Sequence, residues 1–256
     1  MAENSTKNRK PLLSVILIVI IIILAVVNFA YQPTPRVEWQ APAGTTSTKN
    51  SIMEYNWRKT VFLGDSYCAG AGASSQTKRW TTIAAKSLHW EEFNLCLGAN
   101  EYFFPSSDTG EKVCGAATCV DYAAQISDAV ATKPNVVIIS GGRDSLGLVA
   151  TNADEFKAQI CTLFSSVRKS LPKAEIVAIA PFWDATAVPN DLILMNNWIY
   201  GCATQYGAKY IAKSFNWLSS KSAISSDKVH PNDVGHQIIA DKLITWWNNT
   251  AHNKIA

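Results

Sequence analysis

The sequence lacks the patterns by which nucleic-acid-binding and zinc-binding proteins are recognised. Its 23 Lys and Arg and 20 Asp and Glu give a net charge of only +3, and the basic residues are scattered rather than clustered. Nucleic acid is therefore not an expected partner. The sequence has no Cys-x-x-Cys pair and no histidine at ligand spacing from a cysteine, so a zinc site is not expected. No internal repeat is present, which excludes solenoid and propeller architectures.

Charge is also absent from residues 12–30, a run of 19 mostly apolar residues that is long enough to cross a bilayer. Because Lys7, Arg9 and Lys10 precede this run, the positive-inside rule places the N-terminus in the cytoplasm. A cleaved signal peptide is the alternative, but residues 28–30 form a poor cleavage site. Both alternatives export the rest of the chain. We expect a cytoplasmic basic tail (1–10), a transmembrane signal anchor (11–31), an extracytoplasmic tether (32–56) and one domain (57–256).

Six cysteines, an even number, fit an exported domain. Disulfides persist outside the cytoplasm and are rare inside it. The count alone leaves several pairings open. The six are Cys68, Cys96, Cys114, Cys119, Cys161 and Cys202.

Short apolar runs alternate with segments of helical period along the expected domain. We expect strands at 60–63, 92–97, 135–140, 175–180 and 209–212, and helices at 80–88, 119–131, 152–170, 191–206 and 233–248. The alternation predicts an α/β domain, a parallel sheet with helices on both faces. In such a sheet the residues that follow the strands gather at one edge, where ligands bind.

A serine and a histidine far apart in the sequence carry the predicted chemistry. Ser66 follows the first expected strand, although most Gly-Asp-Ser tripeptides are simple turns. A serine hydroxyl is a weak nucleophile that needs a general base, and the base needs a group to orient it. Asp227 and His230 suit these roles, because a carboxylate three residues away in a loop can turn back onto the ring. Alone, Asp-x-x-His before a helix is more often a cap and a surface histidine; with the strand-end serine it predicts a catalytic triad.

These motifs resemble those of the SGNH (GDSL-type) hydrolases over most of residues 58–248. Gly64-Asp65-Ser66 resembles the first family block, Asn-Leu-Cys-Leu-Gly at 94–98 the second and Asp-Lys-Val-His at 227–230 the fifth. The resemblance implies a flavodoxin-like three-layer α/β/α sandwich with a five-stranded parallel sheet. It also implies a triad of Ser66, Asp227 and His230, and an oxyanion hole formed by the backbone N–H groups of Ser66 and Gly98. Exported actinobacterial and actinophage members are the most similar in pattern.

The third block departs from the family pattern, which usually shows Gly-x-Asn-Asp with the asparagine as an oxyanion donor. Residues 140–144 read Ser-Gly-Gly-Arg-Asp instead. Loss of such a donor costs roughly 2.7–4 kcal/mol of transition-state stabilisation. Either Arg143 stands in the asparagine position, or the asparagine is deleted from a Gly-Gly-Arg-Asn-Asp form. The Arg143 guanidinium then either offsets the lost donor or points away and pairs with Asp144 or Asp184. Asn100 is a further candidate donor because it lies close to the second block.

Two residues near the blocks have structural interpretations. Asp65 as a catalytic acid would compete with Asp227, so we favour a role in which its carboxylate accepts loop N–H groups beneath Ser66. His236, at the start of the last expected helix, is expected at the surface or packed against a loop.

The implied fold predicts three disulfides among the six cysteines. Cys68–Cys96 would brace the nucleophile loop against the second block. Cys114–Cys119 would close a small loop near the site entrance. Cys161–Cys202 would join two helices on one face of the sheet.

The combined expectation is a membrane-tethered extracytoplasmic ester hydrolase with an acyl-enzyme on Ser66. Its expected substrate is a small-molecule or envelope-attached ester, an acyl or acetyl ester of an envelope glycan or lipid. No metal or organic cofactor is implied, and a monomer is expected. Two alternatives remain on the same scaffold. One is an O-acyltransferase in which a sugar hydroxyl replaces water, and the other is a non-catalytic envelope-binding protein, which the missing asparagine would explain.

Overall fold

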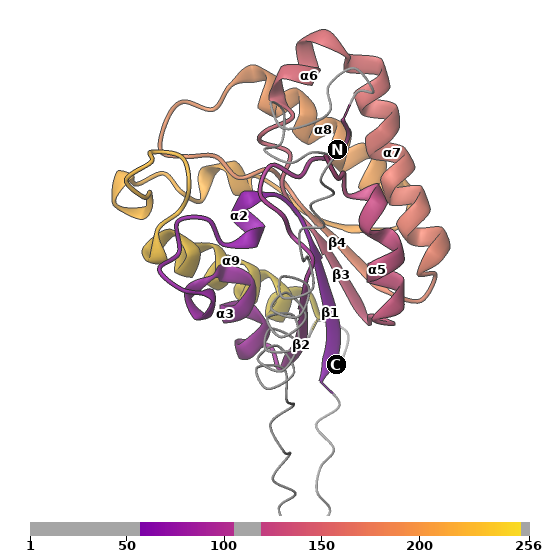
Figure 1. Ribbon diagram of the computed structural model, residues 1–256, viewed down its shortest axis with the longest axis horizontal. Coiled ribbons are helices and arrows are strands. Elements are labelled where there is room, and N and C mark those ends of the chain that lie inside the picture. The colour runs from indigo at the N-terminus through magenta and orange to yellow at the C-terminus, as the bar shows by residue number, and fades with distance from the viewer. Residues whose placement is uncertain (1–56, 105–118, 252–256) are drawn as a thin grey trace, which may run out of the picture. The chain divides into compact units, whose positions relative to one another are not determined.

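The computed structural model describes residues 57–104 and 119–251, which contain a five-stranded parallel sheet with helices on both faces (Figure 1). The strand order is β2-β1-β3-β4-β5. The strands are β1 (Arg58–Leu63), β2 (Trp90–Asn94), β3 (Val136–Ile139), β4 (Glu175–Ile179) and β5 (Lys209–Ile211). The α-helices are α2 (Ser66–Ala69), α3 (Trp80–Ser87), α5 (Ile126–Ala131), α6 (Leu146–Thr151), α7 (Ala153–Ser170), α8 (Asn190–Gln205) and α9 (Asp233–Ala251). The short 3-10 helices are η1 (Gln76–Lys78), η2 (Ala123–Gln125), η3 (Ser214–Asn216) and η4 (Lys221–Ala223).

The sheet buries alternate residues against two helical layers. Val61 and Leu63 of β1 pack in a cluster with α5, α7 and α8, whereas Phe62 packs in a second cluster with α3 and α9. Figure 1 shows α3 and α9 on one side of the sheet and α5 and α7 on the other. Because successive side chains of a strand point to opposite faces, a central strand serves both clusters. This is why all four residues of β3 are apolar and buried.

Helix α7 illustrates how the sequence forms the helical layer. Its buried side chains recur at three- and four-residue steps, at Phe156, Ile160, Leu163, Phe164 and Val167. Asp154 and Glu155 lie in its first turn and Arg168 and Lys169 in its last, which suits the helix dipole at both ends. The pattern therefore sets both the length of the helix and the face it buries.

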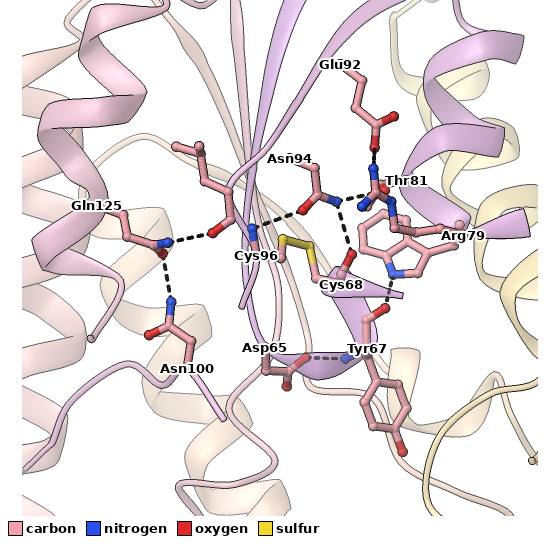
Figure 2. Close-up of a disulfide and its surroundings, with 12 residues drawn as sticks. Asp65, Tyr67, Cys68, Arg79, Thr81, Glu92, Asn94, Cys96, Asn100 and Gln125 are labelled. Carbon is pink, nitrogen blue, oxygen red and sulfur yellow. Dashed lines mark hydrogen bonds and ion pairs between the residues drawn. A yellow bond between two sulfur atoms is a disulfide. The ribbon is translucent and has the colours of Figure 1, made fainter. Parts of the chain in front are cut away.

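The predicted fold class and the five-stranded parallel sheet are confirmed, but the second strand is shorter than expected. β2 ends at Asn94 rather than at residue 97. The Asn94 side chain donates to the Cys68 carbonyl at 3.1 Å and accepts the Cys96 N–H at 3.0 Å (Figure 2). These bonds link the end of β2 to α2, while the Leu95 and Leu97 N–H groups continue to donate to the Phe62 and Gly64 carbonyls.

One expected helix is shorter than predicted, and one observed helix was not predicted. The helix expected at 119–131 is reduced to η2 and α5, because Asp121 forms an isolated parallel bridge with Glu101 and the Tyr122 N–H donates to the Glu101 carbonyl. The segment before α7 forms a separate helix, α6, and the break falls at Asn152, whose φ is −136°.

The expected transmembrane anchor (11–31) and tether (32–56) lie outside the described residues. Within 57–104 and 119–251, no helix is both long and apolar enough to cross a membrane.

Candidate active site

The chain leaves β1 in a tight turn that places Ser66 at the carboxyl edge of the sheet. Gly64 has no room for a side chain, because a Cβ atom there would lie 2.6 Å from the Ser140 carbonyl oxygen. Asp65 then caps the short helix α2 by accepting the Tyr67 N–H at 3.0 Å (Figure 2). Ser66 begins this helix and is half-buried. The turn thus presents the serine hydroxyl beside the loops that follow the other strands.

The structure brings together the three residues that the sequence nominated as a triad. The distance from His230 Nε2 to Ser66 Oγ is 2.9 Å, and that from His230 Nδ1 to Asp227 Oδ2 is 2.7 Å. Both are hydrogen-bond distances. In this arrangement a neutral imidazole can take the serine proton while the carboxylate holds the other ring N–H.

The second carboxylate oxygen of Asp227 shapes the loop that carries His230. Oδ1 accepts the Ser225 hydroxyl at 2.6 Å and the backbone N–H groups of Val229 and His230 at 2.8 and 2.9 Å. The Ser225 hydroxyl, with smaller contributions from His230 and these N–H groups, holds the pKa of Asp227 well below its usual value. The carboxylate is therefore ionised at neutral pH, as a group that stabilises an imidazolium must be.

Arg143, one candidate oxyanion donor, is engaged by other groups. Its Nη2 pairs with Asp184 Oδ2 at 2.8 Å, and its guanidinium carbon lies 3.9 Å from the centre of the Trp183 ring. Its Nη1 donates to the Tyr67 hydroxyl at 3.3 Å. Of the sequence alternatives for Arg143, pairing with Asp184 is the one that the structure contains. We therefore do not count Arg143 as an oxyanion donor.

Tyr67 was not singled out as a site residue by the sequence, yet it joins the two halves of the site. Its hydroxyl donates to the Val229 carbonyl at 2.5 Å, and its ring centre lies 5.5 Å from that of His230. Its ring also stacks on Phe182 at 5.9 Å. The one sequence signal was its position directly after Ser66, which places a buried aromatic ring beside the nucleophile.

Asn100, the other candidate donor, supports the second-block loop from behind. Its Nδ2 donates to Gln125 Oε1 at 2.7 Å, and Gln125 Nε2 donates to the Leu95 carbonyl at 2.6 Å (Figure 2). Its Oδ1 accepts the Glu101 N–H at 3.0 Å. The residue is only 2% exposed, so its side-chain contacts are internal. The expectation that Asn100 acts as an oxyanion donor is therefore replaced by a positioning role.

Gly98 lies in open surroundings beside the nucleophile turn. A Cβ atom at this position would meet no other atom within 4 Å. The neighbouring Leu97 N–H donates to the Gly64 carbonyl at 3.1 Å, which ties the two loops together. Among the described residues, the Gly98 N–H has no hydrogen-bond partner. It is therefore available to a substrate oxygen.

Buried carboxyl groups lie behind the nucleophile. Burial raises the pKa of Asp65 to about 7, against the lowering effect of the Tyr67 N–H. Burial likewise raises the pKa of Glu101 to about 7, although its carboxylate accepts the Ser145 hydroxyl. Gly141 is required here, because its φ is +120° and a Cβ atom would lie 2.8 Å from the Asp65 carboxylate. Asp65 thus has the structural position that the sequence favoured.

His236 is buried and packs against a loop, which is one of its two expected environments. Its Nε2 lies 3.1 Å from the Ala71 carbonyl oxygen, and its Nδ1 lies 3.4 Å from the Trp80 N–H. These partners assign the proton to Nε2, and burial lowers the pKa of the ring. Within residues 57–104 and 119–251, no group of three His, Cys, Asp or Glu side chains is placed to hold a metal ion.

Two of the expected disulfides lie within the described residues. Cys68–Cys96 joins the nucleophile helix to the second-block loop (Figure 2), and Cys161–Cys202 joins α7 to α8. Cys119 is also disulfide-bonded, but its expected partner Cys114 lies outside the described residues. The described cysteines include no free thiol, which suits an oxidising compartment.

The sequence and fold match known ester hydrolases. The model of the GDSL-like lipase/acylhydrolase family matches residues 62–238, a span that includes Ser66, Asp227 and His230. The GDSL lipase Rv0518 of Mycobacterium tuberculosis is 26% identical over 210 residues, which cover 79% of this chain and 87% of that protein.

Solved structures of esterases share the fold at low identity. The psychrotrophic esterase EstA from Pseudoalteromonas sp. has a TM-score of 0.55 and 15% identity, covering 75% of this chain and 99% of that one. The acetyl xylan esterase Est2A from Butyrivibrio proteoclasticus has a TM-score of 0.54 and 17% identity, covering 76% of this chain and 64% of that one. With the family match over most of the chain, these findings establish that the protein belongs to the GDSL-like lipase/acylhydrolase family and is a carboxylic ester hydrolase.

Proposed function

We propose that the protein is an extracytoplasmic serine ester hydrolase that works through an acyl-enzyme on Ser66. The observation that carries the proposal is the continuous hydrogen-bonded series from Ser66 Oγ through His230 to Asp227. A nucleophile, a base within reach of it and a group that orients the base are what acyl transfer requires.

In the acylation step, Ser66 Oγ attacks the ester carbonyl carbon while its proton passes to His230 Nε2. The carbonyl oxygen becomes an oxyanion that accepts the backbone N–H groups of Ser66 and Gly98. When the intermediate collapses, the bond to the alcohol oxygen breaks and that oxygen takes the proton from His230. Asp227 stabilises the imidazolium throughout.

In the deacylation step, water attacks the acyl group on Ser66. His230 takes the proton of the water and returns it to Ser66 Oγ as the ester bond breaks, which releases the carboxylic acid. The alternative O-acyltransferase would use a sugar hydroxyl in place of this water, with the same three residues.

The proposed location and substrate follow from the whole chain. The disulfides and the uncharged run at 12–30 support export to the cell envelope. The proposed substrate is an acyl or acetyl ester of an envelope glycan or lipid. The names of the similar proteins, a lipase and an acetyl xylan esterase, support these two ester classes. Protease added to intact cells that express the full chain should digest the domain, and protection of the domain would contradict export.

A fluorophosphonate probe tests the mechanism directly. The folded wild type should be labelled on Ser66 at neutral pH, and Ser66→Ala and His230→Ala should each abolish labelling. Ser75→Ala, which changes an exposed serine, should leave labelling intact. A folded wild type that stays unlabelled would defeat the proposal and favour a non-catalytic protein. With a glycan acceptor present, more acylated glycan than free acid would favour the acyltransferase.

A further inference from the structure

A pocket of about 340 Å³ lies beside the loop that carries His230. Two segments form it, one directly after β4 and one that leads into α9. Its lining residues are Asp184, Ala185, Thr186, Lys221, Ile224, Ser225 and Lys228. The pocket contacts the triad loop itself, because Ser225 donates to Asp227 and Lys228 is the next residue in the chain.

The position of this pocket assigns it to one side of the ester. Along the sheet, the Gly98 loop follows β2, Ser66 follows β1, and the pocket lies after β4. The proposed oxyanion donor and the pocket therefore lie on opposite sides of Ser66. In acylation the alcohol oxygen receives its proton from the imidazole, so the alcohol leaves on the His230 side. That is the side on which the pocket lies.

The pocket is lined by more positive charge than negative charge. Asp184 is already paired with Arg143 at 2.8 Å, and its other oxygen accepts the Thr186 N–H at 2.8 Å. Lys221 and Lys228 are exposed, and neither has an acidic partner within 4.0 Å among the described residues. The nearby Asp227 carboxylate is hydrogen-bonded to the His230 ring and does not line the pocket. Two lysines without acidic partners among the described residues therefore line the pocket.

We propose that the pocket binds the alcohol part of the ester and that Lys221 and Lys228 favour alcohols that carry an anionic substituent. The proposal rests on the proposed function, and it narrows the substrate to esters of carboxylated or phosphorylated alcohols. Ile224 and Ala185 supply apolar surface for the carbon skeleton of the alcohol. The two ammonium groups attract either anion, so the test must separate carboxylate from phosphate.

Three acetyl esters test the proposal on the full chain: 3-acetoxybenzoate, 3-acetoxyphenyl phosphate and the neutral methyl 3-acetoxybenzoate. Each kcat/KM is divided by the rate of hydroxide-catalysed hydrolysis, which corrects for the leaving group. The wild type should prefer at least one anionic ester at low ionic strength. The double variant Lys221→Gln/Lys228→Gln should lose that preference by about 2- to 30-fold, the range for two exposed ion pairs. Added salt should weaken the preference of the wild type.

A matched control separates the pocket from general charge effects. Lys213→Gln removes another exposed lysine whose backbone is left-handed, with φ of 61° against 64° for Lys228, and Lys213 does not line the pocket. This control should keep the preference. An equal preference in the wild type and the double variant would overturn the proposal, although turnover of the neutral ester would still support ester hydrolysis. No turnover of any ester by folded wild type would instead defeat the proposed function.

Discussion

The two loops that meet at the candidate active site are held in different ways. The nucleophile loop (residues 64–70) is fixed by packing, with Gly64 against Ser140, the residue after β3, and Cys68 bonded to Cys96. The histidine loop (residues 225–231) lies largely at the surface, and the side chain of Asp227 is 48% exposed. Hydrogen bonds that the Asp227 carboxylate accepts from the loop, and one that the Tyr67 hydroxyl donates to it, hold it in place.

The two loops therefore depend on different interactions to hold their catalytic residues in position. A packed turn cannot move without opening the core, so its damage should appear as lost stability. A surface loop held by hydrogen bonds can lose its alignment while the fold survives, so its damage should appear in kcat. Four substitutions test this difference between the loops.

The largest effect is expected from Asp227→Asn in the histidine loop. Asparagine keeps the Oδ1 acceptor for the loop N–H groups but turns an amide toward His230 Nδ1, which favours the wrong tautomer. We expect kcat to fall by about 10⁴-fold, the size of the corresponding effect in a serine protease. Thermal melting should change little because the side chain is half exposed. Steady-state ester hydrolysis measures kcat, and a melting curve measures thermal stability. A kcat within tenfold of wild type would contradict the orienting role.

The next effect is expected from Gly64→Ala in the nucleophile loop. The added Cβ would lie 2.6 Å from the Ser140 carbonyl oxygen, so the backbone must shift. We expect a loss of about 1–3 kcal/mol in the free energy of unfolding, measured by urea denaturation. Gly98→Ala is the matched control, because its Cβ meets no atom within 4 Å and should leave stability unchanged. Equal stability of the two variants would remove the packing argument.

Tyr67→Phe tests the connection between the two loops. It removes the hydroxyl that donates to the Val229 carbonyl and accepts from Arg143. Losing the hydrogen bond to the Val229 carbonyl should lower kcat by roughly 2- to 13-fold and cost about 1 kcal/mol of stability. Tyr210→Phe loses a comparable bond, to Asn196 at 2.6 Å, away from the site. Tyr210→Phe should lower the free energy of unfolding by a similar amount without changing kcat. An equal fall in kcat in the two variants would show that the Tyr67 effect is not local.

The last effect concerns pH and the buried Asp65. Burial raises its pKa from 3.8 to about 7 in the folded protein. The folded state therefore keeps a proton that the unfolded state releases, and the free energy of unfolding falls as pH rises from about 4 to 7. Asp65→Asn keeps the Oδ1 acceptor for the Tyr67 N–H and should show a smaller fall across this window. Urea denaturation at both ends of the window measures it, and equal falls would mean that Asp65 ionises without penalty.

Much of the architecture was predictable because it depends on local patterns. The apolar run of β3 and the helical period of α7 each specify an element and the surface it buries. The parallel order then follows from the alternation of strands and helices, and it brings the ends of distant strands to one edge. Two short motifs, Gly-Asp-Ser and Asp-x-x-His, were therefore enough to nominate Ser66, Asp227 and His230.

The supporting contacts were not predictable in the same way. A long side chain such as Arg143 can reach several partners, and its pairing with Asp184 joins residues 41 positions apart. Asn100 turned inward because Gln125 offers it a buried partner, and the Tyr67 hydroxyl reaches a carbonyl 162 residues away. The sequence by itself thus determined the fold class and the three residues of the candidate triad. The contacts around these residues depend on the tertiary structure. Their side-chain partners come from segments that are distant in the sequence, and local sequence patterns do not predict how such segments pack together.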